Sequence, residues 1–187
     1  MERSVHHYSK TTYLILCALF AALTAAGAWI SIPLPFTPVP VTLATMVTSL
    51  AGGLLGPRYG SISMTVYVLL GTAGAPFFHN FTGGAGIIAG PTGGYIVGYI
   101  FSALICGIML DITKNKKHSF IWIVLSVTTG LFVCYLLGTL WFMISTATGL
   151  IPSLLMCVVP FLPGDALKII ASSLLIKKLR PLVFKKL

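Results

Sequence analysis

The chain has few charged residues, and acidic residues are the scarcest of them. It has 187 residues, with three aspartates or glutamates against twelve lysines or arginines, so that 8% of the chain is charged while 57% is hydrophobic. Ordinary soluble domains are about 25% charged. A chain with so little charge cannot cover a soluble core with polar surface. The composition therefore predicts an integral membrane protein.

Several sequence motifs of enzymes and metal sites are also missing. The sequence has no Gly-x-x-x-x-Gly-Lys-Ser/Thr phosphate loop, no His-Glu-x-x-His zinc motif and no paired carboxylates. Its four cysteines fall in or beside apolar segments without the close spacing of a zinc or redox motif, so we expect them to pack as small core residues. A binding function therefore ranks above an enzymatic one, and we expect no cofactor and no metal.

Six hydrophobic segments divide the chain, at residues 12–30, 41–55, 59–71, 93–110, 120–146 and 162–179. In lipid, each segment must satisfy its own backbone amides, which a helix does and an open strand does not. The expected fold is all-α: one six-transmembrane-helix bundle over residues 1–187. The first segment is longer than a usual signal core, so we expect a retained helix rather than a cleaved signal peptide.

The basic residues predict the orientation of this bundle. They occur in short groups between apolar segments rather than on one polar face, which argues against a nucleic-acid partner. With both termini in the cytoplasm, every basic residue except Lys168 lies on the cytoplasmic side, as the positive-inside rule requires. The alternate loops, 31–40, 77–91 and 148–160, contain no charged residue. We expect all three to face outward, and the first two, which are rich in proline or glycine, to cap a pocket; plain external loops are the alternative.

Asp165 is the acidic residue that lies inside an apolar segment. A charge at mid-membrane depth costs roughly 2.5 to 3.5 kcal/mol, so such a residue is expected to face a cavity, a partner or a substrate. Pro163 and Gly164 predict a helix start here, which puts Asp165 in the first turn, where the helix dipole favours an anion. Lys168 lies on the same face and can neutralise Asp165 or bind an anionic ligand. A purely structural ion pair is the alternative.

Asn80 lies in the second uncharged loop, just before a glycine-rich stretch. Its amide can donate and accept hydrogen bonds at once, which suits a neutral polar ligand, although asparagine is also a common turn residue. Its neighbour His79 is expected at the membrane interface, and we assign it no proton-transfer role.

Ala18, Ala22 and Ala26 recur every four residues on the first segment. Such a stripe of small residues lets another helix approach closely, and close packing is a main source of helix association in lipid. The partner is either another subunit or a helix of the same chain.

Four stretches carry a resemblance to a known family: 35–42 (PFTPVPVT), 52–58 (GGLLGPR), 90–95 (GPTGGY) and 161–168 (FLPGDALK). With them, nearly the whole chain resembles the BioY family, the biotin-binding S components of energy-coupling factor (ECF) transporters. The resemblance implies a multi-pass protein in the plasma membrane of a prokaryote that captures biotin from outside. It also implies docking on a transmembrane T component with two ABC ATPase subunits, through Ala18, Ala22 and Ala26.

The resemblance further implies roles in the biotin site. Asp165 would accept hydrogen bonds from the ureido N–H groups, Asn80 would complete these contacts, and Lys168 would meet the valerate or pair with Asp165. The remaining candidates are wall residues and glycines that let the loop backbone approach the ligand: Tyr95, Phe36, Gly83, Gly84 and Gly86. Residues 78–84 are bulkier than the family pattern, so the identity of the ureido-binding amide stays open.

Two other functions compete with this one. In a stand-alone, ion-coupled secondary carrier for a small organic solute, Asp165 would be a proton or ion site. An intramembrane enzyme is the third hypothesis, for which the sequence has no catalytic motif.

Overall fold

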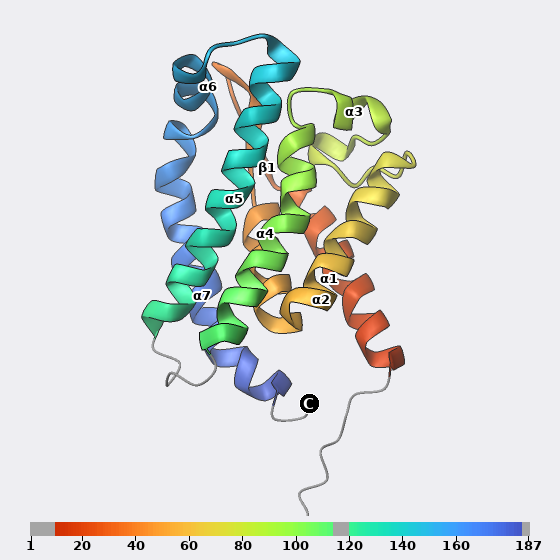
Figure 1. Cartoon of the computed structure of the whole chain (residues 1–187). Helices are drawn as coiled ribbons and strands as arrows, with labels where there is room; N and C mark the ends of the chain where they lie inside the picture. Colours follow the sequence, from red (N-terminus) through yellow and green to blue (C-terminus); the bar gives the residue numbers. More distant parts are fainter. Residues whose placement is uncertain (1–9, 114–119, 185–187) are drawn as a thin grey trace, which may run out of the picture.

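The computed structural model describes residues 10–113 and 120–184 (Figure 1). Several basic residues on which the predicted orientation depends lie outside this range: Arg3, Lys114, Lys116, Lys117, Lys185 and Lys186. The long helices are α1 (Lys10–Trp29), α2 (Ala44–Thr72), α4 (Gly93–Ile112), α5 (Phe120–Thr146) and α7 (Leu162–Phe184). The shorter elements are β1 (Ser31–Leu34), β2 (Thr37–Thr42), α3 (Ala85–Ala89), α6 (Leu150–Cys157) and the 3₁₀ turns η1 (His79–Phe81) and η3 (Val159–Phe161).

Four helical stretches are long and apolar enough to cross a membrane: α1, α4, α5 and the stretch Leu150–Val183 that contains α7. They contain the segments predicted at 93–110, 120–146 and 162–179, and α1 covers nearly all of 12–30. The described chain is thus mostly helical and multi-pass, as its composition predicts.

The segments predicted as separate helices at 41–55 and 59–71 form one element, α2, which reverses direction in the middle (Figure 1). Gly56 has φ 78° and ψ 178°, a conformation that side chains rarely adopt, and Pro57 follows it. The two halves pack tightly, because a Cβ on Gly60 would come within 2.8 Å of the Gly52 Cα. Gly56 therefore turns the chain back on itself without a loop.

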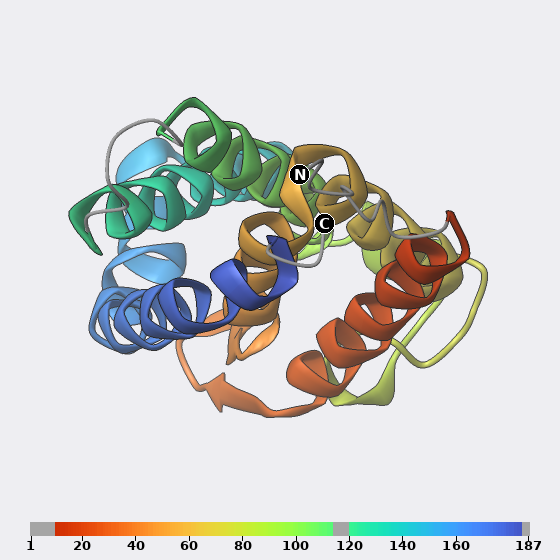
Figure 2. The ribbon, with the colours of Figure 1, turned by 90° about the horizontal axis from the view of Figure 1, so that it is seen from below.

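Viewed along the helices, α2 lies between α1 on one side and α4, α5 and α7 on the other (Figure 2). The approach of α2 to α4 is close, since a Cβ on Gly52 would lie 2.3 Å from the Ala103 carbonyl oxygen. The four cysteines are buried, which confirms that they pack in the core. Small residues thus let α2 occupy the centre of the bundle.

The all-α expectation needs a correction, because the predicted loop 31–40 forms most of an antiparallel hairpin. Strand β1 pairs with β2 through Ser31↔Thr42, Ile32↔Val41 and Leu34↔Thr37. Valine and threonine favour strands, and prolines, which cannot donate a backbone hydrogen bond, are confined to edge strands. A two-stranded hairpin has only edge strands, so it accommodates the four prolines of this stretch.

The other two predicted outer loops also contain structure. Residues 77–91 include η1 and α3, and residues 148–160 include α6 and part of η3. Together with the hairpin they cover the end of the bundle opposite to that at which α1 begins and α7 ends (Figure 1).

Candidate functional site

An ion pair lies in the first turns of α7. The Lys168 Nζ is 2.9 Å from the Asp165 Oδ1, and Asp165 is only 3% exposed. The η3 turn leads directly into α7 and sets Asp165 in the first turn. The free backbone amides at a helix N-terminus stabilise a negative charge there. Position i+3 then brings Lys168 alongside.

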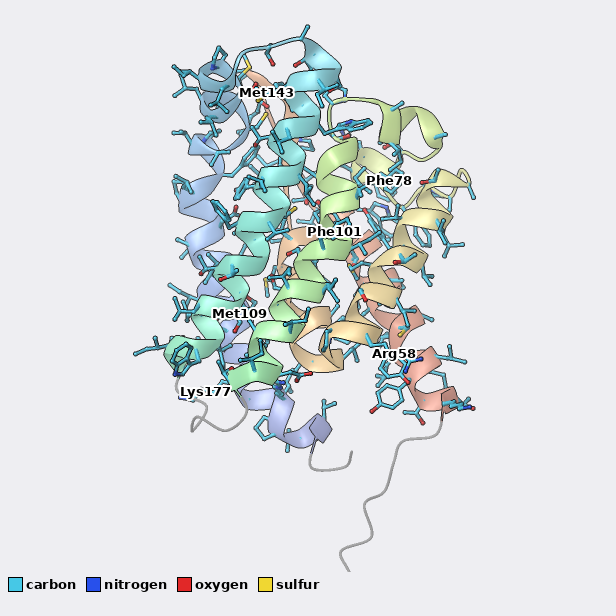
Figure 3. The ribbon with its side chains drawn as sticks, viewed as in Figure 1. Arg58, Phe78, Phe101, Met109, Met143 and Lys177 are labelled. Carbon is cyan, nitrogen blue, oxygen red and sulfur yellow. The ribbon has the colours of Figure 1, made fainter. Side chains whose placement is uncertain are left out.

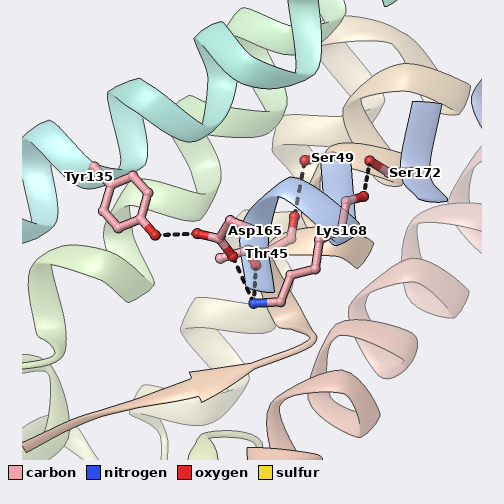
Figure 4. Close-up of polar contacts among 6 residues, drawn as sticks. All are labelled: Thr45, Ser49, Tyr135, Asp165, Lys168 and Ser172. Atoms are coloured by element: carbon pink, nitrogen blue, oxygen red, sulfur yellow. Dashed lines mark hydrogen bonds and ion pairs between the residues drawn. The ribbon is translucent and has the colours of Figure 1, made fainter. Parts of the chain in front are cut away.

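Two other helices contribute polar groups to this pair (Figure 4). The hydroxyl of Tyr135, on α5, donates a hydrogen bond to the Asp165 Oδ2. The Lys168 Nζ also contacts the Thr45 Oγ1, on α2, at 3.5 Å. Each Asp165 oxygen therefore has one side-chain partner among the described residues. Because a carboxylate offers about four acceptor positions, about two of them are left for a ligand.

A small cavity borders the ion pair; we call it the ion-pair cavity. Its volume is about 50 Å³, and β2 forms one wall while α4, α5 and α7 form the others. A second cavity of about 30 Å³, the His79 cavity, adjoins it. The two share five wall residues, Val39, Pro40, Thr42, Tyr95 and Tyr99. They therefore lie side by side beneath the hairpin, and we call the two together the cleft.

A larger groove of about 430 Å³ runs between α5, α6 and α7, and Asp165 and Tyr135 also border it. Its other walls are almost entirely apolar and include the exposed side chains Leu136, Leu154 and Leu162. Such a lining matches lipid rather than a polar ligand. We therefore place the candidate site in the cleft beneath the hairpin, where several side-chain donors and acceptors converge.

The profile of the BioY family matches residues 1–185. The chain belongs to the BioY family. Over 125 residues it is 46% identical to the protein named biotin transporter BioY of Thermotoga maritima, an alignment that spans 67% of this chain and 70% of the relative. The BioY protein of Rhizobium etli is 33% identical over 172 residues, 89% of this chain and 91% of the relative.

A solved structure supports the same relationship. The crystal structure of the S component for biotin from an ECF-type ABC transporter matches with a TM-score of 0.83 and 31% identity, covering 91% of this chain and 92% of that one. This BioY chain therefore shares the fold of an S component.

Among the predicted site residues of this BioY chain, the structure brings Asp165, Lys168 and Tyr95 together at one cavity. The Tyr95 hydroxyl lies 3.2 Å from the Thr139 Oγ1 and donates to the Cys157 carbonyl at 3.4 Å. These contacts hold the ring of Tyr95 against the C-terminal end of α6.

Two predicted contacts lie away from the cleft. Phe36 is at the tip of the hairpin and is 54% exposed, because residues 35–36 form the turn. Asn80 is exposed with φ 54°, and its Oδ1 accepts a hydrogen bond from the Ser31 Oγ at 2.8 Å. In this conformation Asn80 ties η1 to the hairpin.

The three predicted glycines also lie away from the cleft walls. A Cβ on Gly83 would come within 2.1 Å of the Ala75 carbonyl oxygen, so Gly83 permits close packing of the loop on itself. Gly84 has φ 102°, and open space surrounds the Cβ position of Gly86. In this conformation these glycines shape the loop rather than approach the cleft.

Sequence reasoning did not select Tyr135, Thr45 or Tyr99, and it placed His79 at the interface rather than in a cavity wall. Tyr135 lies in a segment that is apolar on all sides, so hydrophobic periodicity does not show which face of this helix packs inward. Tyr135 and Asp165 are 30 residues apart in the sequence, and this spacing does not predict a contact between them. Only the packing of α5 against α7 brings these two side chains together.

The alanine stripe of α1 faces away from the bundle. Ala18 and Ala22 are exposed and Ala26 is half-buried, whereas the neighbouring Ala21 and Ala25 are each 2% exposed against α2. The neighbouring row therefore packs within the chain, and the stripe is accessible to another molecule.

Proposed function

We propose that this chain captures biotin and acts as the S component of an ATP-driven ECF transporter, releasing biotin to the cytoplasm. Relatives named biotin transporters and an S component for biotin share its sequence and fold. In the structure, the proposal rests on the buried Asp165 carboxylate, which borders the cleft and has acceptor positions left for a ligand.

The ureido ring of biotin offers two N–H donors and one carbonyl acceptor. Asp165 accepts from the N–H groups through charge-assisted bonds, which are roughly twice as strong as neutral ones. Lys168 has three N–H donors, of which one meets Asp165 and one reaches Thr45 at 3.5 Å. Its third donor is available to the ureido carbonyl. Tyr95 and Tyr99 cover the apolar thiophane ring.

Biotin enters when the hairpin moves. A cavity of about 50 Å³ holds a few water molecules, which need about 10–15 Å³ each, and is too small for biotin. Strand β2 supplies four residues of the wall, 39–42, and pairs only with β1 in the described structure. The hairpin can therefore swing away while the helices stay packed. We assign Asn80 to the closed state, in which its bond to Ser31 holds the hairpin down.

We propose one substrate-binding domain, residues 1–187, that crosses the plasma membrane of a prokaryote six times. The passes are α1, the two halves of α2, α4, α5 and α7. Both termini are cytoplasmic, because Arg58 and Lys177 lie at the end where α1 begins and α7 ends (Figure 3). The hairpin, Asp165 and the cleft then face outward.

The chain has no phosphate-loop motif, so partners supply the energy. These partners are a T component and two ABC ATPase subunits. The stripe of Ala18, Ala22 and Ala26 on α1 is the docking surface for the T component, because small side chains let a helix of the partner approach closely.

Two experiments test this function. The purified chain in lipid nanodiscs is titrated with biotin by calorimetry, and we expect one saturable site. Vesicles with the chain alone are compared with vesicles that also contain the T component and ATPases. Uptake only with ATP and the partners supports the S component, whereas uptake by the chain alone, driven by an ion gradient, would support the secondary carrier.

A further inference from the structure

His79 is a half-buried histidine whose ring makes no hydrogen bond among the described residues. Both ring nitrogens are shielded from solvent, and neither has a partner among the described residues. A buried polar atom that makes no hydrogen bond costs free energy. Such a group in a cavity wall therefore has unused capacity to bind a polar ligand.

The backbone around His79 holds its side chain in this position. Asn80 and Phe81 both have positive φ, 54° and 58°, which is uncommon for residues other than glycine. The His79 carbonyl accepts hydrogen bonds from the Thr82 amide at 3.2 Å and the Thr82 hydroxyl at 2.7 Å. A turn kept in this costly conformation directs His79 to the cavity and Asn80 to the surface.

The surroundings of His79 carry no charge. The His79 cavity is lined by the titratable side chains Tyr67, Tyr95 and Tyr99, and no lysine, arginine, aspartate or glutamate lines it. Burial lowers the pKa of His79 below its usual value. The imidazole is therefore neutral at pH 7 until a negative charge comes close.

The cleft thus has two chemically different ends. Asp165 and Lys168 stand at one end, already paired with each other, and His79 stands at the other. A carboxylate ligand group would be repelled by Asp165, while the uncharged end, where the neutral His79 ring offers one N–H donor, suits it. The charged end of an acid bound in this cleft is therefore directed toward His79.

We propose that His79 binds the carboxylate of the captured acid as an imidazolium, taking up one proton from water when the ligand binds. This rests on the proposed function, in which that acid is biotin. The ligand carboxylate arrives ionised and the imidazole arrives neutral, so the complex gains one proton and the imidazolium donates a hydrogen bond to the carboxylate. His79 then recognises the valerate, and Lys168 stays with Asp165 and the ureido group.

The sign of the pH dependence follows from this step. The bound carboxylate raises the pKa of His79 above its value in the free protein. Between those two pKa values the complex holds one proton more than the free protein, so affinity falls as pH rises. Asp165 and Lys168 pair with each other in the adjoining cavity and do not line that of His79. An uncharged ligand should bind without this dependence.

The test compares biotin with biotinamide, whose terminal amide carries no charge, on the wild-type chain and on His79→Gln. For the wild-type chain we expect the Kd for biotin to rise about 10-fold between pH 6 and pH 8. One linked proton changes the Kd by at most about 10-fold per pH unit, and here it is linked over only part of the range. The Kd for biotinamide should stay constant. His79→Gln should bind biotin about 10-fold more weakly at pH 6, without pH dependence, and bind biotinamide as the wild type does.

Calorimetry in two buffers of different ionisation enthalpy measures the proton directly. For the wild type we expect uptake for biotin and none for biotinamide, a comparison that does not depend on any variant folding. Equal proton uptake for the two ligands, or an unchanged pH profile in His79→Gln, would overturn the proposed role of His79 but not the proposed function. If the wild type binds neither ligand, the proposed function fails, and this role fails with it.

Discussion

Replacing Asp165 by asparagine tests the centre of the site. Asparagine keeps the shape of the side chain but removes the charge, and its single oxygen offers two acceptor positions where the carboxylate offers about four. In the wild type, Lys168 and Tyr135 occupy one position on each carboxylate oxygen. In Asp165→Asn the ligand must therefore compete with these neighbours for the remaining acceptor.

The expected loss of affinity follows from these bonds. A hydrogen bond to a charged group contributes roughly 1.5 to 3 kcal/mol and a neutral one about 1 kcal/mol. If one ureido N–H loses its charged acceptor and the other loses its acceptor altogether, the loss is about 3 kcal/mol. That corresponds to a Kd for biotin about 100-fold higher, since 1.4 kcal/mol is a factor of ten.

The assay is calorimetric titration of the purified chain in nanodiscs, with Asp111→Asn as the matched control. Asp111 also accepts a charged hydrogen bond from α7, from the Arg180 Nη2 at 2.9 Å, but it lines neither cavity. We expect Asp111→Asn to bind biotin within about 2-fold of wild type, well under 1 kcal/mol. A folded Asp165→Asn chain whose Kd stays within about 3-fold of wild type would refute the reasoning.

Three further substitutions address other parts of the structure. Tyr135→Phe removes one hydrogen bond to the site carboxylate, about 1 kcal/mol, and should raise the Kd for biotin about 5-fold in the same titration; an unchanged Kd would mean that this hydroxyl does not orient the carboxylate. Ala22→Leu fills the exposed stripe and should reduce copurification with the T component and ATPases, while Ala166→Leu, also at an exposed alanine, should not; equal yields would exclude the stripe as the contact. Gly52→Ala pushes a Cβ to 2.3 Å from a backbone carbonyl of α4 and should lower the melting temperature by several degrees, while Gly86→Ala, with open space around it, should not. Equal melting temperatures for the two glycine variants would show that α2 can move away from α4.

Local sequence patterns predicted a large part of this protein. The membrane class follows from composition, because a chain with so little charge must use lipid as its solvent. The pairing of Asp165 with Lys168 is also local: residues three apart on a helix share a face. The turn in α2 has a local signal too, since glycine followed by proline interrupts a helix.

Other features depended on contacts between distant segments. A membrane helix is as apolar toward lipid as toward its neighbours, so the sequence of α5 does not reveal that Tyr135 faces Asp165. From its sequence, the first uncharged loop is expected to be a simple connection between helices. In the structure its strands pair with each other, and the resulting hairpin covers the cleft. Phe36 then lies at the exposed tip of that hairpin.

The sequence by itself determined that this is a multi-pass membrane protein with a paired charge at the start of its last helix, because hydrophobicity and helical spacing act over a few residues. Tertiary structure alone decided which side chains surround that pair and which face the cleft. For His79 and Asn80 the choice was made by two backbone φ angles in η1, which turn one side chain inward and the next outward. These angles belong to Asn80 and Phe81; asparagine tolerates a positive φ, but phenylalanine rarely adopts one, so the residues alone do not predict this turn.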